Sequence, residues 1–531
     1  MSTSDLSFVG RGFITLAGLT LLYTLLSRLL AQRFHRSALR DMAGPPCISW
    51  LRGSASIPHY EAQRLELEWV KTYGKTFKFY GPLKARIFTT EGTQHRLQRR
   101  ILTPAFGSAE LRRQTEVFVS KANAVCRARA PQLCSIWKDM LANSKRSDDS
   151  AKVDALSWLT KVTLDIICVA GFNYDTDSLH APDDDPDELN RAVRSLFSFS
   201  IDDPLFVLQL IFPIFRRIVC VFSLFTNTPP DKYDSRPDAT MRRIGMRLME
   251  EKKALAAVQS GQVASGIQAT RKDDIEGSDL LSLLIKANMA TDLPDRLRLS
   301  DEDMVAQMPA FIVAGHETTA TAITWGLFSL CLAQHVQTKL REELLGIATD
   351  TPSMDDLNDL PYLDMVIREV LRLYPPAGSM ERSASYDDVI PLSEPYTDKQ
   401  GKVHHEIVVS RGDNIFLPYH AFQLSEDIWG SDAGEFRPER WEAVPETAKV
   451  LPNVWSNLPV FGAGPHACMG YRFAVVEMKA LLFALVRNFE LHLAVSPSEV
   501  VRQTIVVMRP TLTTHPAAGP QLPLTIRPVR L

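Results

Sequence analysis

The chain has 531 residues, of which 45% are hydrophobic and 23% charged, a composition typical of a globular protein. Its net charge of -3 offers no basic excess, which argues against a nucleic-acid-binding protein. Seven cysteines are scattered singly, with no Cys-x-x-Cys pair. This distribution favours neither a disulfide framework nor a zinc module, and it indicates a reducing compartment.

An uncharged apolar run from Gly12 to Ser27 predicts a membrane anchor. The run is slightly short for a span, but residues 29–31 extend it if Arg28 snorkels to the interface. One basic residue, Arg11, precedes the run, and four follow it: Arg28, Arg33, Arg36 and Arg40. The positive-inside rule therefore places the rest of the chain in the cytosol. A cleaved signal peptide fits less well, because the small-x-small cleavage pattern is missing. We expect residues 1–31 to form an anchor and residues 32–60 a basic, proline-containing hinge.

Residues 61–531 show neither an internal repeat nor a clean boundary, which predicts one large domain that is mainly α-helical with small β-sheets. The periodicity predicts helices over residues 111–141, 153–172, 239–259, 300–331, 362–374 and 471–489. Strand-like runs occupy residues 76–80, 84–90, 406–410 and 414–417. The apolar segment 205–215 is too short to cross a membrane; it fits an interfacial segment and an ordinary buried helix equally well.

The segment from Phe461 to Gly470 holds one cysteine, Cys468, among glycines and a proline, directly before a predicted helix. Glycine and proline at this density hold the backbone in a shape that side chains would forbid. A thiol in such a loop is a candidate metal ligand, because nearby backbone N–H groups stabilise a thiolate. The alternative is a buried structural cysteine, which is the commoner role of a lone cysteine.

Ser300 is predicted to cap the long helix, which Pro309 should bend. Ala310, Ala314 and Thr318 are spaced four residues apart and form a stripe of small residues that would let a flat, bulky group approach the backbone. Glu317 and Thr318 place an acid and a hydroxyl in apolar company, which is costly unless they are paired or functional. Thr318 bonding back to a helix carbonyl is a structural alternative that is compatible with function.

Two further predicted helices, over residues 362–374 and 91–106, carry charged residues that bear on function. In the predicted helix 362–374, Glu369 and Arg372 form an i, i+3 pair on the more apolar face, which suggests partial burial rather than an ordinary surface salt bridge. Residues 91–106 form a strongly basic helix that includes His95 and Arg99, which alone indicates only a solvated or anion-facing surface.

Together these segments resemble the cytochrome P450 family of haem-thiolate monooxygenases over residues 60–531. Four residues match its cysteine-ligand loop: Phe461, Gly464, Cys468 and Gly470. Ala314-Gly315-x-Glu317-Thr318 matches its oxygen-activation helix, and His95-x-x-x-Arg99 matches its haem-propionate helix. Glu369-x-x-Arg372 with Arg440 matches its Glu-Arg-Arg triad. The anchor resembles the microsomal branch, and the segments 99–106 and 461–470 resemble fungal members.

The resemblance implies roles for these residues. Cys468 would be the axial ligand of haem b (iron protoporphyrin IX), in the loop shaped by Phe461 and Gly470. Glu317 and Thr318 would relay protons during oxygen activation. Three residues would pair with haem propionates, namely Arg99, His466 and, more weakly, Arg382. Three would brace the structure behind the haem, namely Glu369, Arg372 and Arg440.

The resemblance also implies partners and an activity. Electrons would come from NADPH–cytochrome P450 reductase, with cytochrome b5 as an additional donor, docking on a basic face near Arg96, Arg100 and Lys479. The enzyme would sit in the endoplasmic reticulum membrane, single-pass, with its catalytic domain cytosolic. It would insert one oxygen atom from O₂ into a lipophilic small molecule, in fungal secondary metabolism such as terpenoid or polyketide tailoring. The alternatives are an O₂-independent haem-thiolate isomerase or dehydratase, and an inactive, truncated haem protein.

The sequence departs from the family pattern at two places. His466 stands where many relatives have arginine, so the propionate contact is expected to be weaker and pH-sensitive. Between Thr90 and Glu91, several tens of residues that relatives place between strand and basic helix are missing. That segment normally covers the substrate pocket. A gene-model or splicing artefact is the first explanation, and a shortened, more open pocket is the second.

Overall fold

The computed structural model describes residues 38–45, 62–78, 96, 99–123, 132–144, 146–181, 187–196, 236–259, 279–288, 298–504 and 507–529. The predicted anchor, the strand 84–90, the segment 205–215 and the Thr90–Glu91 junction lie outside these ranges. The chain divides into two compact units, one formed by residues 1–84 and 379–417 and the other by residues 85–378 and 418–531.

The described part of the smaller unit combines two antiparallel strand pairs with short helices. Strand β2 (Met380–Ser383) pairs with β5 (Asn414–Leu417), and β3 (Asp388–Thr397) pairs with β4 (Val403–Val409). The pairing of β3 with β4 shifts register between Pro391 and Tyr396. The helical pieces are η1 (Ala38–Asp41) and α2 (Ala62–Tyr73). The predicted strands 406–410 and 414–417 are therefore present, whereas residues 76–78 are not in a strand.

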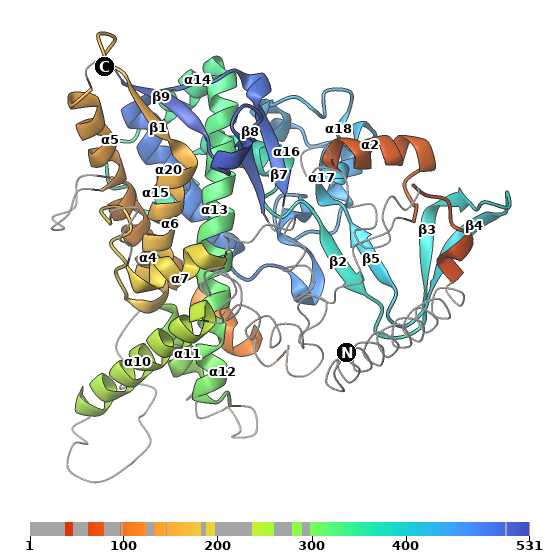
Figure 1. The fold of residues 1–531 in the computed structure, drawn as a ribbon, viewed down its shortest axis with the longest axis horizontal. Coiled ribbons are helices and arrows are strands. Elements are labelled where there is room, and N and C mark those ends of the chain that lie inside the picture. The colour runs from red at the N-terminus through yellow and green to blue at the C-terminus, as the bar shows by residue number, and fades with distance from the viewer. Residues whose placement is uncertain are drawn as a thin grey trace, which may run out of the picture. The chain divides into compact units, whose positions relative to one another are not determined.

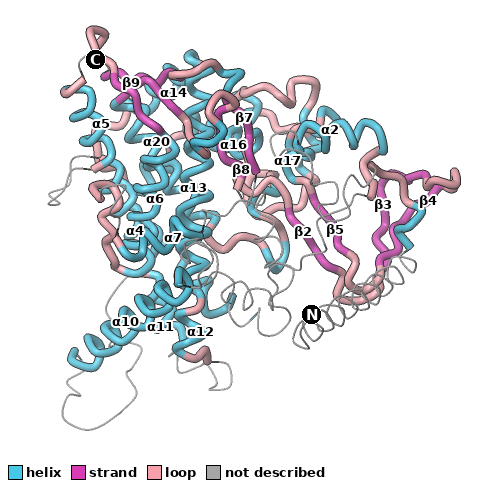
Figure 2. Tube along the Cα trace, in the orientation of Figure 1, coloured by secondary structure: helices cyan, strands magenta, loops and turns pink. Residues whose placement is uncertain are grey.

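The larger unit is mostly helical (Figure 2). Its first half contains η3 (Thr103–Phe106), α4 (Ser108–Ala122), α5 (Leu133–Ala142), α6 (Ala155–Phe172), α7 (Glu188–Leu196), α10 (Arg236–Gln259), α11 (Leu280–Asn288), α12 (Asp301–Val305) and α13 (Gln307–Leu332). Its second half contains α14 (Gln334–Leu345), α15 (Met354–Asn358), α16 (Pro361–Leu373), α17 (Tyr419–Gln423), α18 (Glu426–Trp429), η7 (Pro438–Glu442), α19 (Glu446–Lys449), η8 (Pro459–Phe461), η9 (Gly464–His466), α20 (Tyr471–Asn488), η10 (Pro497–Glu499) and η11 (Pro516–Ala518).

The described strands of the larger unit form two small antiparallel sheets. One has the order β1–β9–β6 and is built from β1 (Ala151–Asp154), β9 (Pro523–Pro528) and β6 (Phe489–Leu493). The other is a hairpin of β7 (Val500–Thr504) and β8 (Met508–Leu512), which contacts α13. The predicted architecture, mainly helical with small sheets, is thus the observed one.

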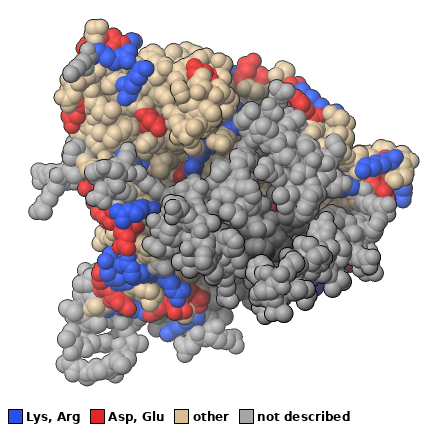
Figure 3. All heavy atoms as spheres, in the orientation of Figure 1, with Lys and Arg blue, Asp and Glu red and all other residues tan. Residues whose placement is uncertain are grey.

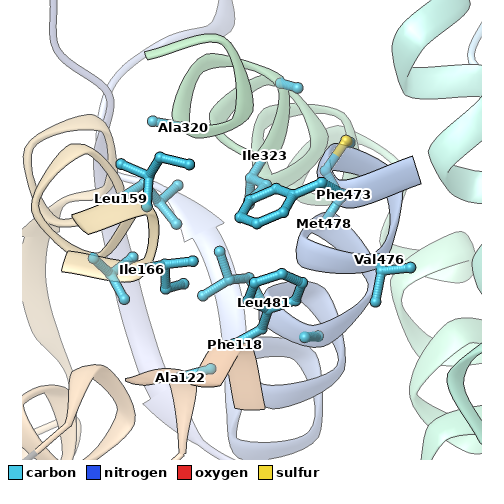
Figure 4. Close-up of a cluster of buried hydrophobic side chains, with 14 of the residues drawn as sticks. Phe118, Ala122, Leu159, Ile166, Ala320, Ile323, Phe473, Val476, Met478 and Leu481 are labelled. Atoms are coloured by element: carbon cyan, nitrogen blue, oxygen red, sulfur yellow. The ribbon is translucent and has the colours of Figure 1, made fainter. Parts of the chain in front are cut away.

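Helix α13 is the axis of the larger unit, with α6 and α20 packed along it (Figure 1). The core between α4, α6, α13 and α20 is apolar, and its residues interdigitate from all four helices (Figure 4). Gly315 allows α13 to approach α6 closely, because a Cβ there would lie 2.8 Å from Ile167 Cγ1 on α6. The packing of α6 against α13 therefore depends on a glycine directly beside the predicted acid–hydroxyl pair.

The long helix predicted over residues 300–331 is interrupted. Ser300 accepts a hydrogen bond from Asp303 N, as its capping role predicts, but α12 ends at Val305 and α13 begins at Gln307. Pro309 explains the break. Proline offers no N–H to the carbonyl of Val305 four residues earlier, and its ring clashes with that carbonyl. The distortion therefore lies before the proline rather than at it.

Among the described residues, α6 is the helix long and apolar enough to cross a membrane by length and composition. Since 72% of it is buried inside the protein, it is a core helix. On the face in Figure 3, acidic and basic side chains lie side by side around α10. Arg242 pairs there with Glu302 at 2.9 Å, and Arg243 pairs with Glu188.

Candidate active site

The loop before α20 is held in shape by its own backbone. Cys468 N donates to Phe461 O at 2.7 Å, and Ala467 N donates to Gly464 O at 3.1 Å. Gly462 and Gly464 have positive φ angles of 71° and 68°, which side-chain-bearing residues rarely adopt. The predicted rigid glycine loop is therefore observed around Cys468.

Cys468 is an exposed residue, although the protein atoms around its thiol raise the pKa of the thiol by desolvation. A backbone hydrogen bond from Gly470 and the charge of Arg99 oppose that shift, because both favour the thiolate. Arg99 Nη1 also donates to Ala467 O at 2.6 Å. The predicted propionate partner Arg99 is thus tied to the loop itself. An exposed cysteine with the Gly470 N–H and the charge of Arg99 acting on its thiol has the features of a ligand rather than of a buried structural cysteine.

The other residues of the predicted haem-binding set lie as follows. Phe461 packs between Trp455 and Tyr471, at centroid distances of 5.6 and 6.0 Å. Gly470 precedes α20 with φ of -86°, so its backbone does not require glycine. His466 is exposed on η9. Arg382 lies on β2 in the smaller unit and is described within that unit alone.

Helix α13 presents the predicted stripe of small residues on an accessible side. Ala310 and Ala314 are exposed and Thr318 is half-buried. Thr318 Oγ1 donates to Ala314 O at 2.6 Å. The structure therefore shows the hydrogen bond from Thr318 back to a helix carbonyl that the sequence analysis gave as the structural alternative. Phe106 connects this helix to the cysteine loop, because its ring lies 6.0 Å from that of Phe311 and 3.7 Å from where a Cβ on Gly470 would be.

Glu317 is buried, with 3% of its surface exposed, and it forms an ion pair that the sequence did not indicate. Its Oε1 lies 2.5 Å from Arg509 Nε on β8, and its Oε2 lies 3.6 Å from His316 Nε2. Burial lowers the pKa of His316; Glu317 opposes that shift and Arg509 adds to it. No sequence signal pointed to Arg509, which lies far from Glu317 along the chain on a short hairpin.

Glu369, Arg372 and Arg440 meet in the interior of the larger unit. Arg372 donates to both Glu369 oxygens at 2.9 and 2.8 Å, and Arg440 Nε donates to Glu369 Oε1 at 3.2 Å. Glu369 and Arg372 are fully buried. Arg372 also donates to three backbone carbonyls, those of Gln423, Ala433 and Glu435. The three residues thereby join α16 to the segment 423–440.

Two members of this network were not predicted. Trp441 Nε1 donates to Glu369 Oε2 at 3.1 Å, and Asp432 accepts from Arg440 Nη1 at 2.7 Å. Asp432 neutralises the second arginine, and hydrogen bonding to Arg440 lowers the pKa of its carboxyl. Nothing in the local sequence links Asp432 or Trp441 to Glu369.

The expectation for Lys479 was wrong. Lys479 is 3% exposed and lies 3.1 Å from both Asp364 Oδ1 and Asn358 Oδ1. A buried, paired ammonium cannot serve as a docking charge for a reductase. Arg96 and Arg100 are exposed, as that role requires.

Comparison with known proteins establishes the family to which the chain belongs. The family model described as Cytochrome P450 matches residues 60–516, most of the chain. The chain belongs to the cytochrome P450 family. Cytochrome P450 monooxygenase 205 from Postia placenta is 42% identical over 534 residues, covering 93% of this chain and 93% of the relative. This cytochrome P450 is therefore a monooxygenase, an oxidoreductase that uses haem b.

Other relatives are also fungal. Ganoderic acid synthetase CYP5150L8 from Ganoderma lucidum is 34% identical over 448 residues, covering 82% of this cytochrome P450 and 76% of the relative. Among solved structures, a cytochrome P450 designated CYP102L1 matches with a TM-score of 0.56 and 23% identity, covering 83% of this chain and 80% of that one. The structural match supports the fold.

The residues of this cytochrome P450 fit haem b. Cys468 is an exposed residue, and Gly470 N–H and Arg99 favour the ionised form of its thiol. The exposed Ala310 and Ala314 provide a flat, small-residue surface on α13. Cys468 would hold the iron, and Arg99, which donates to Ala467 O, and the exposed His466 are the candidates for the propionates.

Proposed function

We propose that this cytochrome P450 inserts one oxygen atom from O₂ into a lipophilic small molecule of fungal secondary metabolism, for example a terpenoid or polyketide. NADPH–cytochrome P450 reductase would supply the electrons. The observation that carries the proposal is the accessible Cys468 in its glycine loop, together with the Glu317–Thr318 pair beside an exposed small-residue stripe. Relatives named monooxygenases, and one named ganoderic acid synthetase, support it.

Thiolate-ligated haem b supplies the redox chemistry that activates O₂. The chain's own part is to hold the cofactor and move protons. The Gly470 N–H and the charge of Arg99 oppose the desolvation that raises the pKa of Cys468, and so favour its ionised form. Thr318 would give its hydroxyl proton to the reacting centre, after breaking its bond to Ala314 O, and would be reprotonated from the side of Glu317. Glu369, Arg372 and Arg440 would keep the segment before the cysteine loop rigid.

We propose further that residues 1–31 anchor the enzyme in the endoplasmic reticulum membrane with the catalytic domain in the cytosol. The uncharged run from Gly12 to Ser27 and the arginines after it support this topology. Proteolysis of intact microsomes tests it, because a cytosolic domain would be digested without detergent and a lumenal one would be protected.

Product analysis tests the activity. The full chain is expressed in yeast membranes with a fungal reductase, supplied with NADPH and candidate lipophilic substrates, and products are examined by mass spectrometry under ¹⁸O₂. Incorporation of one labelled atom is expected. NADPH-independent rearrangement of a peroxide, unchanged in Thr318→Ala, would instead establish the isomerase or dehydratase class. A thiolate spectrum without turnover of any substrate would indicate an inactive haem protein.

The short junction at Thr90–Glu91 is relevant to the possibility of an inactive haem protein. The alignment with monooxygenase 205 runs over 534 positions but includes only 93% of this chain's 531 residues, so several tens of the relative's positions have no counterpart here. This supports the expected missing segment without locating it. Sequencing the transcript across the junction distinguishes the explanations, since an uninterrupted cDNA would rule out the artefact.

A further inference from the structure

We propose that Thr163 of α6 is a positioning residue for Glu317 and Thr318: its hydroxyl holds the peptide group that precedes Glu317, and so fixes the backbone from which both side chains start. The inference rests on the proposed role of Glu317 and Thr318 in oxygen activation. It adds a residue from a second helix, far from α13 along the chain, to those that determine how the acid–hydroxyl pair is presented.

The hydrogen bond from Thr163 joins two helices inside the core. Thr163 Oγ1 lies 3.0 Å from the carbonyl oxygen of His316, and Thr163 is fully buried. The carbonyl of His316 belongs to the same planar peptide group as the N–H of Glu317. A donor that holds this carbonyl therefore fixes the peptide plane directly before Glu317.

Close packing of α6 on α13 makes this bond possible. A Cβ on Gly315 would lie 2.8 Å from Ile167 Cγ1, so the two helices approach closely one residue before His316. Thr163 and Ile167 are four residues apart and share one face of α6. The same face of α6 thus supplies both an apolar contact and a hydroxyl to α13.

The segment of α13 that receives the bond carries two other side-chain hydroxyls. Thr318 Oγ1 donates to Ala314 O at 2.6 Å, and Thr319 Oγ1 donates to Gly315 O at 3.1 Å. Hydroxyls that bond to carbonyls four residues earlier slightly destabilise a helix and often bend it. The backbone at the acid–hydroxyl pair is therefore the part of α13 that benefits from an outside support.

Thr163 provides that support, because its hydroxyl comes from α6 and reaches the next carbonyl, that of His316. Without this bond the backbone at Glu317 gains freedom, and the acid and the hydroxyl of Thr318 are misaligned for part of the time. Positioned groups tolerate little displacement, since an error of about 1 Å slows a reaction substantially.

The Thr163 hydroxyl also lies near two carbonyls of its own helix, Leu159 O at 2.9 Å and Thr160 O at 3.3 Å. A hydroxyl carries one proton, so this proton is shared between α6 and α13. The matched control is therefore a buried threonine that donates within its own helix. Thr324 of α13 meets this requirement, because it is fully buried and donates to Ala320 O at 2.7 Å.

The test compares the full-length wild-type enzyme with Thr163→Val, Thr163→Ser and Thr324→Val. Valine keeps the branched side chain without the hydroxyl, and serine keeps the hydroxyl. Hydrogen exchange of residues 315–320, followed by mass spectrometry, reports on the backbone at the pair. Thr163→Val should raise the exchange rate about two- to tenfold, the effect of one net hydrogen bond. Thr163→Ser and Thr324→Val should keep the wild-type rate.

Turnover gives the second readout, as product formed per NADPH consumed. A variant that merely folds less well loses both rates together, so this ratio stays constant. Thr163→Val should lower the ratio about two- to tenfold, while Thr163→Ser and Thr324→Val should match the wild type. Adding Thr163→Val to Thr318→Ala should change the ratio little, because the positioned hydroxyl is already absent.

An unchanged ratio in Thr163→Val, or an equal loss in Thr324→Val, would overturn the proposal. If the wild type makes no product, the proposed function fails, but hydrogen exchange still decides whether Thr163 holds the backbone before Glu317. If Thr163→Val does not accumulate, Thr163→Ala replaces it: this variant should show the loss that Thr163→Ser avoids, and equal values in the two would contradict the role of the hydroxyl.

Discussion

Arg99 Nη1 donates to the carbonyl oxygen of Ala467 at 2.6 Å, so the basic helix is fastened to the residue directly before Cys468. The same guanidinium lowers the pKa of the Cys468 thiol against the effect of burial. One side chain thereby fixes the loop and favours the ionised sulfur, which explains why this arginine belongs to the candidate site even apart from the haem propionates.

Replacing Arg99 by glutamine should accelerate haem loss. Hydrogen bonds that involve a charged group contribute about 1.5–3 kcal/mol, which corresponds to a haem dissociation rate at least about tenfold higher. Transfer of haem to apomyoglobin measures that rate. Arg113→Gln is the control, since Arg113 is exposed and pairs with Glu110 on its own helix. Equal rates in both variants would show that Arg99 has no part in retaining haem.

Glu369→Gln should destabilise the folded protein by about 3–5 kcal/mol, because it leaves two buried guanidinium groups without their shared carboxylate. Arg372→Lys should also be severe, since lysine cannot reproduce the two-pronged contact and the three carbonyl bonds. Denaturant unfolding followed by tryptophan fluorescence provides the measurement.

Asp355→Asn is the matched control for the triad. Asp355 lies 3.2 Å from Arg112, with 64% and 55% of the two side chains exposed, and such a pair contributes about 1 kcal/mol or less. A triad variant no less stable than Asp355→Asn would refute a bracing role for Glu369.

The long helices α6, α10, α13, α16 and α20 and the candidate ligand loop could be predicted from local sequence, because periodicity, capping residues and glycine density act over short distances. The pairing of Glu369 with Arg372 is equally local, three residues apart on one face. Arg509, Asp432 and Trp441 could not be predicted, because each reaches its partner only through tertiary packing. The expectation that Lys479 is an exposed docking charge was wrong for the same reason, because the local sequence does not reveal its contacts with Asp364 and Asn358.

Gly315→Ala should destabilise the enzyme by about 1–3 kcal/mol, because the added methyl group would overlap Ile167 at 2.8 Å. Trimming the neighbour should relieve the overlap, so the Gly315→Ala/Ile167→Ala pair should cost less than the sum of the single substitutions. Thermal unfolding of the four proteins gives the coupling. Strict additivity would mean that α6 and α13 do not pack as described.

Glu477 on α20 is fully buried, and burial raises its pKa well above the usual value, although Thr319 opposes the shift. The folded state therefore keeps its proton at pH values where the unfolded chain has lost it. The contribution of Glu477 to the free energy of unfolding should therefore fall as the pH rises above the usual pKa of glutamate, and Glu477→Gln should remove this component.

Glu499→Gln provides a control of opposite sign for Glu477. Hydrogen bonds from Ser496 and Thr514 lower the pKa of Glu499, so its stabilisation is present at neutral pH and is lost as the pH falls. Glu477→Gln should thus gain relative stability with rising pH, whereas Glu499→Gln should not. A Glu477→Gln variant with the pH dependence of wild type would contradict the burial of a neutral acid on α20.

The ferrous–CO difference spectrum tests the assignment of Cys468 most directly. Cys134→Ser is the control, because Cys134 is buried and burial raises the pKa of its thiol to about 12, which excludes a thiolate. Wild type and Cys134→Ser should give the red-shifted Soret band of a thiolate ligand, and Cys468→Ser should lack it. Absence of the band from the wild type, or its persistence in Cys468→Ser, would contradict the assignment.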